Sequence, residues 1–161
     1  MTINSIQIRP ASELDLDHIC ALSEQINQQH HLAAPHTFVG KINREFERLF
    51  WRAKLELPDN IHLIARCDNA VLGYITASVN ETMGNPFLLQ HKICRIGTIV
   101  VAQHSHRLGV GKALMDAAIA WGAQQRASEI RLEVFDFNTN AMAFYEQLGF
   151  VVQSHIMQKN I

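Results

Sequence analysis

Short runs of alternating or continuous apolar residues along the chain predict the strands of a sheet. Ile6 and Ile8 alternate with polar neighbours and give a first strand that Pro10 ends. Further apolar runs predict strands over residues 61–67, 71–80, 93–102, 130–135 and 150–157. Clusters of Asp, Asn, Gly and Pro separate several of these runs, as turns require. The long run at 93–102 indicates a central, buried strand.

Four other segments carry the apolar spacing of an amphipathic helix. The first begins after Ser12, a favourable N-cap residue, and its apolar stripe is Leu14, Ile19, Leu22 and Ile26. The second covers residues 39–55, and one face of it is Ile42, Phe46, Leu49 and Phe50. The third covers residues 109–126, and its inner face is Leu114, Met115, Ala118 and Trp121. The fourth covers residues 139–148 and ends at Gly149.

The predicted elements follow one another in the order β, α, α, β, β, β, α, β, α, β. That order indicates a mixed sheet with helices on its faces, in the α/β or α+β class. The chain has 161 residues and shows neither a repeat nor a linker-like stretch, so residues 1–161 are expected to form one domain.

Composition narrows the class of protein. The formal net charge is −1, so there is no overall basic footprint for nucleic acid. The three cysteines, Cys20, Cys67 and Cys94, lie in apolar runs at long spacings, which indicates reduced, buried thiols in a reducing compartment. The sequence shows no leader pattern and no apolar run of the ~18 residues that a membrane span needs. A cytoplasmic protein without a membrane partner is therefore expected.

Histidine is frequent, with nine residues, which raises the question of a metal site. His30, His31 and His36 lie close together in sequence, and His104 and His106 are two residues apart. No carboxylate or cysteine at ligand spacing completes either group, so no metal is predicted.

A turn between a buried strand and a helix carries the strongest chemical signal. Residues 106–111 read His-Arg-Leu-Gly-Val-Gly, and Lys112 follows. Free amides at a helix N-terminus attract phosphate, and Arg107 and Lys112 add positive charge. The P-loop pattern fails because His106 and Ala113 stand where it needs Gly and Ser or Thr, and the dinucleotide pattern fails at Leu114. A tight turn without a ligand is the alternative that this segment leaves open.

The same segment consists of a hydrophobic strand followed by His-Arg-Leu-Gly-Val-Gly-Lys-Ala-Leu. It resembles the acetyl-CoA motif of the GNAT family of N-acetyltransferases. A second resemblance follows at the expected distance, where Asn138 leads to Phe144-Tyr145-Glu146-Gln147-Leu148-Gly149-Phe150. The resemblance covers residues 93–150. It implies a GNAT fold, with a mixed, mostly antiparallel sheet of about six to seven strands flanked by about four helices.

The resemblance also implies the site residues. The backbone of Ile99, Val100 and Val101 is expected to contact the acetyl and pantetheine arm of acetyl-CoA. The pyrophosphate is expected to lie on His106, Arg107, Leu108, Gly109, Val110, Gly111 and Lys112. Asn138 is expected to touch the pantetheine or pyrophosphate region, and the hydroxyl of Tyr145 to point at the CoA sulfur. His106 and Arg107 depart from the family pattern, which has Arg or Gln and then Gly at these two places.

An amine attacking the thioester directly needs no enzyme nucleophile, but a base and an acid assist it. Tyr145 is the predicted acid. Glu81, at the end of a predicted strand, is the predicted base, with His91, His104 or ordered water as alternatives. Residues 31–38 are expected to line the acceptor cleft, and the resemblance is compatible with a homodimer.

The acceptor itself stays open among a protein N-terminus, a lysine, a polyamine, an aminoglycoside and an amino acid. A non-catalytic acyl-CoA-binding or regulatory domain on the same fold is the alternative to the enzyme.

Overall fold

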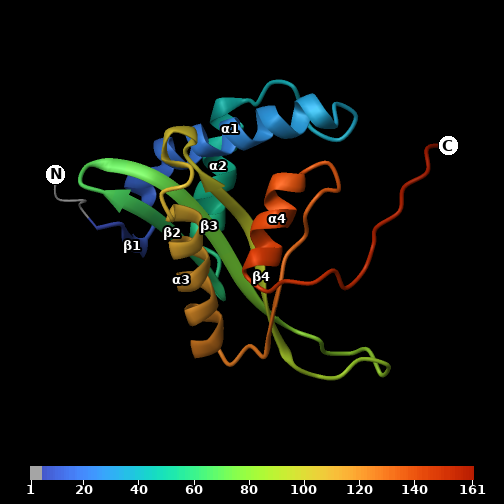
Figure 1. Cartoon of the computed structure of the whole chain (residues 1–161). Helices are drawn as coiled ribbons and strands as arrows, with labels where there is room; N and C mark the ends of the chain where they lie inside the picture. Colours follow the sequence, from blue (N-terminus) through green and yellow to red (C-terminus); the bar gives the residue numbers. More distant parts are fainter. Residues whose placement is uncertain (1–4) are drawn as a thin grey trace.

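A single five-stranded sheet forms the centre of the molecule, seen here in a computed structural model that describes residues 5–161 (Figure 1). Residues 1–4 lie outside the described residues, and so does the part of the no-leader expectation that concerns them. The strands are β1 (Gln7–Pro10), β2 (Asn60–Cys67), β3 (Ala70–Glu81), β4 (Lys92–Val101) and β5 (Glu129–Arg131). They lie in the order β1-β2-β3-β4-β5, with antiparallel neighbours except for the parallel pair β4 and β5.

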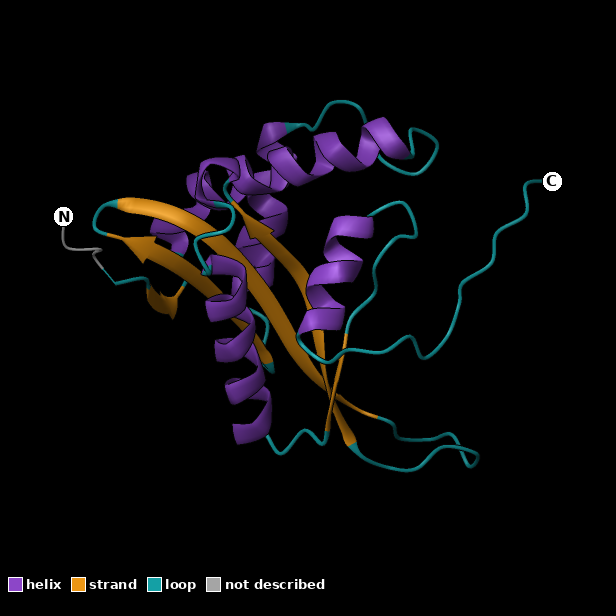
Figure 2. Cartoon of the chain, viewed as in Figure 1, coloured by secondary structure: helices purple, strands orange, loops and turns teal. Residues whose placement is uncertain are grey.

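Helices cover both faces of this sheet (Figure 2). They are α1 (Leu16–Ala33), α2 (Arg44–Leu55), α3 (Val110–Gln124) and α4 (Thr139–Gln147), with short 3₁₀ turns η1 (Glu13–Asp15) and η2 (Gln103–Ser105) before α1 and α3. Side chains of α1 and α2 pack in one buried cluster, and side chains of α3 and α4 pack in the other.

The two clusters explain why the strands read as continuous apolar runs. Successive side chains of a strand point to opposite faces. On β2, Leu63 and Ala65 therefore face α3, while Ile64 faces α1 and α2. Tyr74 and Val100 join Ile64 on the α1 side. Burial on both faces leaves no polar side for these central strands.

The predicted mixed, mostly antiparallel fold is confirmed, but the strand count of six to seven is wrong. The structure has five strands among the described residues, and β5 is only three residues long. Residues 132–135 lose the ladder because they diverge from β4. Residues 150–157 were predicted as a strand, but no strand within residues 5–161 lies beside them to pair with, and regular strand structure needs that partner.

The predicted inner face of α3 is confirmed, since Leu114, Met115 and Ala118 are fully buried. The prediction for α2 is wrong in two ways. The helix begins at Arg44, where the Asn43 side chain caps it by accepting from the backbone N–H of Phe46 at 3.0 Å. Its predicted apolar face, Phe46, Leu49 and Phe50, is exposed, and the buried residues are Glu47 and Trp51.

The start of α1 also differs from the prediction. Residues 13–15 form a 3₁₀ turn, so Leu14 is 92% exposed and Leu16 is buried in its place. Asp15 accepts from the backbone N–H of Ser12 at 2.8 Å and from both terminal nitrogens of Arg9 at 2.8 and 2.6 Å. The Arg9 guanidinium lowers the pKa of the buried Asp15 carboxyl to about 2.

Within residues 5–161 no disulfide joins any of the three cysteines. Cys20 and Cys94 are buried as predicted, and Cys67 is half-buried. Burial raises the pKa of Cys20 to about 11, so this thiol stays protonated and unreactive. In residues 5–161, no helix combines the length and the apolar character needed to cross a bilayer, and no three His, Cys, Asp or Glu side chains gather as a metal site would require.

Candidate active site

Strands β4 and β5 separate after a short stretch of parallel pairing. The ladder joins residues 93–95 of β4 to residues 129–131, and no pairing follows. The separation coincides with a β-bulge in which Gly97 is the extra residue opposite Thr76 and Ala77. A Cβ at Gly97 would lie 2.7 Å from Thr76 Oγ1, so any other residue would force the Thr76 side chain to move. Bulges bend and twist a strand, and this one turns β4 away from β5.

The backbone of β4 beyond the bulge faces this opening at alternate residues. The N–H of Thr98 donates to Thr76 Oγ1 at 2.9 Å, and the N–H of Ala102 donates to the β3 side at 2.8 Å. The backbone groups of Val100 also face β3, because the backbone groups of a strand alternate between its two sides. The backbone groups of Ile99 and Val101 therefore face the opposite edge, which no strand among the described residues covers. The Val101 carbonyl there accepts from Gln25 Nε2 and from His106 Nε2, each at 3.0 Å. Of the three predicted residues, Ile99 and Val101 therefore reach the opening through their backbone.

The glycine-bearing turn leads from β4 through η2 into α3. Arg107 has φ +63° and Gly109 has φ +81°, both in the left-handed region. No described residue accepts a hydrogen bond from the backbone N–H groups of residues 107–112. These amides lie where the partial positive charge of α3 is concentrated. The turn therefore offers a row of free donors to an anion, with the exposed side chain of Arg107 beside them.

Gly111 and Lys112 have different surroundings within that turn. A Cβ at Gly111 would meet the ring of Phe144 at 3.3 Å, so glycine lets α4 pack closely against the start of α3. The Lys112 ammonium pairs with Asp116 at 2.5 Å on the exposed face of α3. Leu108 is exposed, and Val110 is buried in the core.

Helix α4 carries the two predicted residues of the second motif. Asn138 is its N-cap, with the side-chain oxygen accepting from the backbone N–H of Ala141 at 3.2 Å. The ring of Tyr145 packs between Phe144 and Phe150, with centroids 5.4 and 5.9 Å away. Burial raises the pKa of Tyr145, so its hydroxyl keeps its proton at neutral pH. No described residue forms a hydrogen bond with that hydroxyl.

Glu81 stands apart from these residues. It ends β3 opposite Lys92, the first residue of β4, and its carboxylate lies 3.8 Å from the Lys92 ammonium. A strand rises about 3.3 Å per residue, so Lys92 and Ile99 are roughly 20 Å apart along β4. The structure thus brings together the turn, the open edge of β4 and α4, but not Glu81.

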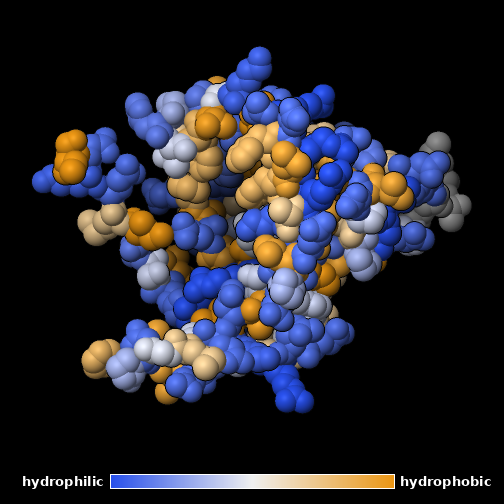
Figure 3. Space-filling model, turned by 180° about the vertical axis from the view of Figure 1, so that it is seen from behind, coloured by the Kyte–Doolittle hydropathy of each residue, from blue (hydrophilic) through white to orange (hydrophobic). Residues whose placement is uncertain are grey.

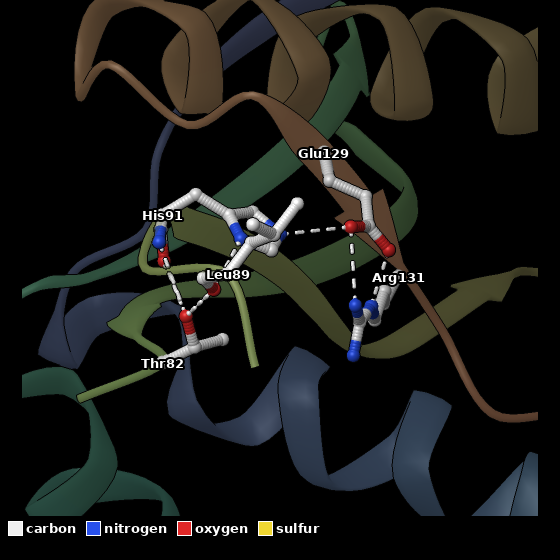
Figure 4. Close-up of polar contacts among 5 residues, drawn as sticks. All are labelled: Thr82, Leu89, His91, Glu129 and Arg131. Carbon is white, nitrogen blue, oxygen red and sulfur yellow. Dashed lines mark hydrogen bonds and ion pairs between the residues drawn. The ribbon is translucent and has the colours of Figure 1, made fainter. Parts of the chain in front are cut away.

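His91 is also engaged elsewhere (Figure 4). Its Nε2 lies 3.0 Å from Glu129 Oε2, and its Nδ1 lies 2.9 Å from the carbonyl oxygen of Leu89. Both ring nitrogens of His91 therefore face acceptors within the chain. Arg131 binds the same carboxylate, and the hydrogen bonds from Arg131 and His91 lower the pKa of Glu129 to about 2. Both ring nitrogens of His91 are thus engaged in contacts away from the opening between β4 and β5.

A cluster of rings closes the end of the opening near α1. It joins His30 of α1, Phe38 of the α1–α2 connection, and Phe135 and Phe137 after β5. The His30 and Phe38 rings stack at 4.7 Å, and Phe38 meets Phe135 edge-on at 5.0 Å. Burial lowers the pKa of His30, which keeps the ring uncharged. His31 holds the connection in place by bonding to the Phe38 carbonyl oxygen at 2.8 Å.

Sequence reasoning missed two polar residues around this region, Gln25 and His62. Gln25 ties α1 to the end of β4, because its Oε1 also accepts from the backbone N–H of Gln103 at 3.1 Å. His62 donates from Nε2 to the Lys54 carbonyl oxygen at 2.9 Å and accepts at Nδ1 from the Tyr74 hydroxyl. A histidine inside an apolar strand run was a visible signal for His62. Gln25 gave no signal, since a polar residue on a helix is ordinarily solvent-exposed.

A pocket of 190 Å³ lies on the α2 side of the bulge, where it meets Gly97. Its lining includes Trp51 and Lys54 of α2 together with His62 and Thr76 of the sheet. Burial lowers the pKa of His62 and keeps its ring uncharged. The pocket therefore reaches the opening of the sheet from the face opposite α3.

Known proteins share this arrangement. The acetyltransferase (GNAT) family model matches residues 24–150. An N-alpha-acetyltransferase of Sulfurisphaera tokodaii is 28% identical over 149 residues, which cover 89% of this chain and 79% of that protein.

Two solved structures show the same fold. The F44R mutant of the BH1408 protein of Bacillus halodurans superposes with a TM-score of 0.87 at 23% identity, over 96% of this chain and 99% of that one. The aminoglycoside N-acetyltransferase AAC(6')-Iy in complex with CoA gives 0.78 at 18% identity, over 98% and 95%. The family match covers most of the chain and both motifs of the opening between β4 and β5. The chain therefore belongs to the GNAT acetyltransferase family and is an acetyl-CoA-dependent N-acetyltransferase.

Proposed function

We propose that the chain transfers the acetyl group of acetyl-CoA to a primary amine by direct attack within a ternary complex, with residues 1–161 acting as one catalytic domain and without a metal. The observation that carries this proposal is the row of unpaired amides at residues 107–112, which lies beside the uncovered edge of β4. A ligand with a diphosphate and a long amide-bearing arm fits both features at once.

The cofactor roles follow from this fit. The backbone amides of residues 107–112 would hold the pyrophosphate, and the guanidinium of Arg107 would add a charge-assisted bond. His106 takes part by fixing the end of β4, since its ring bonds to the Val101 carbonyl oxygen. The backbone of Ile99 and Val101 would pair with the amides of the pantetheine arm, as a neighbouring strand would. Asn138 would act from the N-terminus of α4, which its side chain caps.

Tyr145 is the proposed acid. The leaving thiolate has a parent thiol pKa near 8.5, so a hydrogen bond or proton from a neighbouring hydroxyl assists its departure. The Tyr145 hydroxyl remains protonated because burial raises its pKa, and no described residue competes for it. The Tyr145 hydroxyl can therefore donate to the CoA sulfur without first breaking another hydrogen bond.

The base is the less constrained part of the mechanism. A lysine side chain has a pKa near 10.4, so about one lysine amine in 10³ is neutral at pH 7. An α-amine has a pKa of about 7.7–8.0, so about one-tenth of such amines are neutral at the same pH. Glu81, the predicted base, is paired with Lys92 and distant from Ile99 along β4. An α-amine acceptor reduces the need for any base and is compatible with this separation.

A peptide α-amine is the acceptor class that we favour. The Sulfurisphaera tokodaii relative is an N-alpha-acetyltransferase. The rings of His30, Phe38, Phe135 and Phe137 are uncharged, which suits the apolar side chains of a peptide better than a polycationic aminoglycoside.

The test is release of free CoA from acetyl-CoA, measured with a panel of short peptides, one aminoglycoside and no acceptor. Release should be fastest with a free peptide N-terminus and should fall to background when the same peptide is N-terminally blocked. In parallel, acetyl-CoA at about 100 times its Kd should stabilise the fold by about 2.7 kcal/mol. Stabilisation without release on any amine would favour the non-catalytic alternative, and faster release with the aminoglycoside would overturn the peptide assignment.

A further inference from the structure

The floor of the 190 Å³ pocket beside α2 is hydrophilic. Asn60 of β2 and Arg95 of β4 both lie opposite Ser78 of β3, so these three side chains form a row on one face of the sheet. The next row of the same floor is also polar and consists of His62, Thr76 and Thr98. Figure 3 shows this side of the molecule, where hydrophilic side chains partly border a hollow in the surface. A ligand in the pocket therefore meets hydrogen-bonding groups.

The charges that line this pocket are positive. Its lining includes Lys54 and Arg95 but no Asp or Glu among the residues that the structure describes. The Lys54 ammonium lies 5.5 Å from the centre of the Phe50 ring, a contact that leaves its charge without a counterion. Within residues 5–161, the guanidinium of Arg95 forms no ion pair and no hydrogen bond. Both cations are thus available to an anion from outside the chain.

Arg131 provides a comparison within the same sheet. It is the strand partner of Arg95 across β4 and β5, so both side chains leave the sheet on the same face. The guanidinium of Arg131 binds the Glu129 carboxylate, which His91 also contacts (Figure 4). Like charges at opposed strand positions repel each other. An anion bound beside Arg95 would offset that repulsion, as Glu129 does for Arg131.

The pocket lies within reach of the reacting group. Its lining includes Gly97, and the proposed place of the acetyl arm is the backbone of Ile99. At about 3.3 Å per residue, Ile99 is roughly 7 Å from Gly97 and roughly 13 Å from Arg95 along β4. An extended acceptor chain covers these distances in about two to four residues. The side chains that follow the reacting amine of a peptide can therefore reach the two cations.

We propose that this pocket selects acceptor peptides with Asp or Glu at the second or third residue. The inference rests on the proposed function, in which the reacting amine is a peptide N-terminus. Arg95 binds the carboxylate, because a guanidinium presents paired donors that match its two oxygens, and Lys54 adds a second positive charge. The uncharged ring cluster that contains His30 and Phe38 takes the first side chain. A polycationic acceptor is disfavoured by the same two charges.

Peptides that differ only in charge test this selection. Each is a pentapeptide with an N-terminal alanine and with glutamate, glutamine or lysine at both its second and third positions. For the wild-type enzyme, kcat/KM from CoA release should be about 3–5-fold higher with the glutamate peptide than with the glutamine peptide, and lowest with the lysine peptide. The preference should shrink as the salt concentration rises from about 0.1 M to about 1 M, because screening weakens the attraction.

Substitutions of Arg95 locate the effect. Arg95→Gln should bring kcat/KM for the glutamate and glutamine peptides within about a factor of two of each other, and Arg95→Glu should make the lysine peptide the better substrate. Arg126→Gln removes an exposed arginine just after α3 and is the matched control, which should keep the wild-type ratio. Each ratio compares two peptides on one variant, so a partly folded preparation lowers both rates alike.

The outcomes separate this inference from the proposed function. Equal rates with the glutamate and glutamine peptides on the wild-type enzyme, or a ratio that Arg95→Gln leaves unchanged, would overturn the selection while the acetyltransfer to peptides stands. No release with any peptide would overturn the proposed function and this inference with it. Faster release with free glutamate than with any of the peptides would assign the carboxylate to a free amino acid and refute the peptide as its source.

Discussion

Arg107 holds a backbone conformation that glycine adopts more readily, and this has a measurable effect on stability. Its φ of +63° lies in the left-handed region, where an L-residue with a Cβ loses roughly 1–2 kcal/mol. Glycine avoids this penalty but gives up about 0.5–1 kcal/mol more backbone entropy on folding. We expect Arg107→Gly to be more stable than Arg107→Ala by about 0.5–1 kcal/mol, or about 1–4 °C in Tm. Both variants lose the guanidinium, so the difference reports the backbone alone.

Urea unfolding of the two variants, monitored by circular dichroism, measures this difference. The neighbouring His106 has φ −64°, an ordinary extended conformation, and serves as the matched control. There the order should reverse, with His106→Ala more stable than His106→Gly by about 0.5–1 kcal/mol. If Arg107→Ala proved as stable as Arg107→Gly, the left-handed turn would not exist in solution, and the free amides that depend on it would have to be reassigned.

Three further results are expected. Tyr145→Phe should lower kcat by about 10²-fold or more and leave the Kd for acetyl-CoA from calorimetry nearly unchanged; an unaltered kcat would remove Tyr145 from the mechanism. Glu81→Gln should leave kcat/KM for an α-amine within about a factor of two, because Glu81 lies far from Ile99, and a loss of about 10² would restore it as the base. Asp15→Asn should lower the free energy of unfolding by about 2 kcal/mol at pH 7. The pKa of Asp15 falls from 3.8 to about 2 on folding, so this contribution is present above about pH 4 and disappears as pH falls toward 2; equal losses at pH 7 and pH 2 would contradict it.

The spacing of apolar residues predicted the buried face of a helix correctly where the helix packs mainly against one surface. Helix α3 packs mainly on the sheet, and its apolar stripe of Leu114 and Met115 is the buried one. Helix α2 packs against α1 as well as β2. The local sequence pattern does not reveal the contact with α1, and in the folded chain Glu47 is buried while Phe46 is exposed. The same limit applied to residues 150–157. Their strand character was readable, but the sequence pattern could not show that no strand among the described residues pairs with them.

The candidate site divides in the same way. The turn at Gly109 could be predicted because glycine at a helix start has few uses, and the order of the two motifs placed Tyr145 near it. The free amides could not be predicted, because they depend on the backbone conformation of Arg107. Nor could the position of Glu81, since it depends on the register that pairs it with Lys92.

The bulge at Gly97 has a consequence for how the enzyme meets its cofactor. The Thr76 hydroxyl accepts from the N–H of Thr98, so the extra residue is accommodated without leaving that amide unsatisfied. The divergence of β4 and β5 is then a fixed property of the polypeptide rather than a shape that acetyl-CoA must induce. The conformational freedom lost on binding falls mainly on the flexible pantetheine chain, and the enzyme can release CoA without rebuilding its sheet between turnovers.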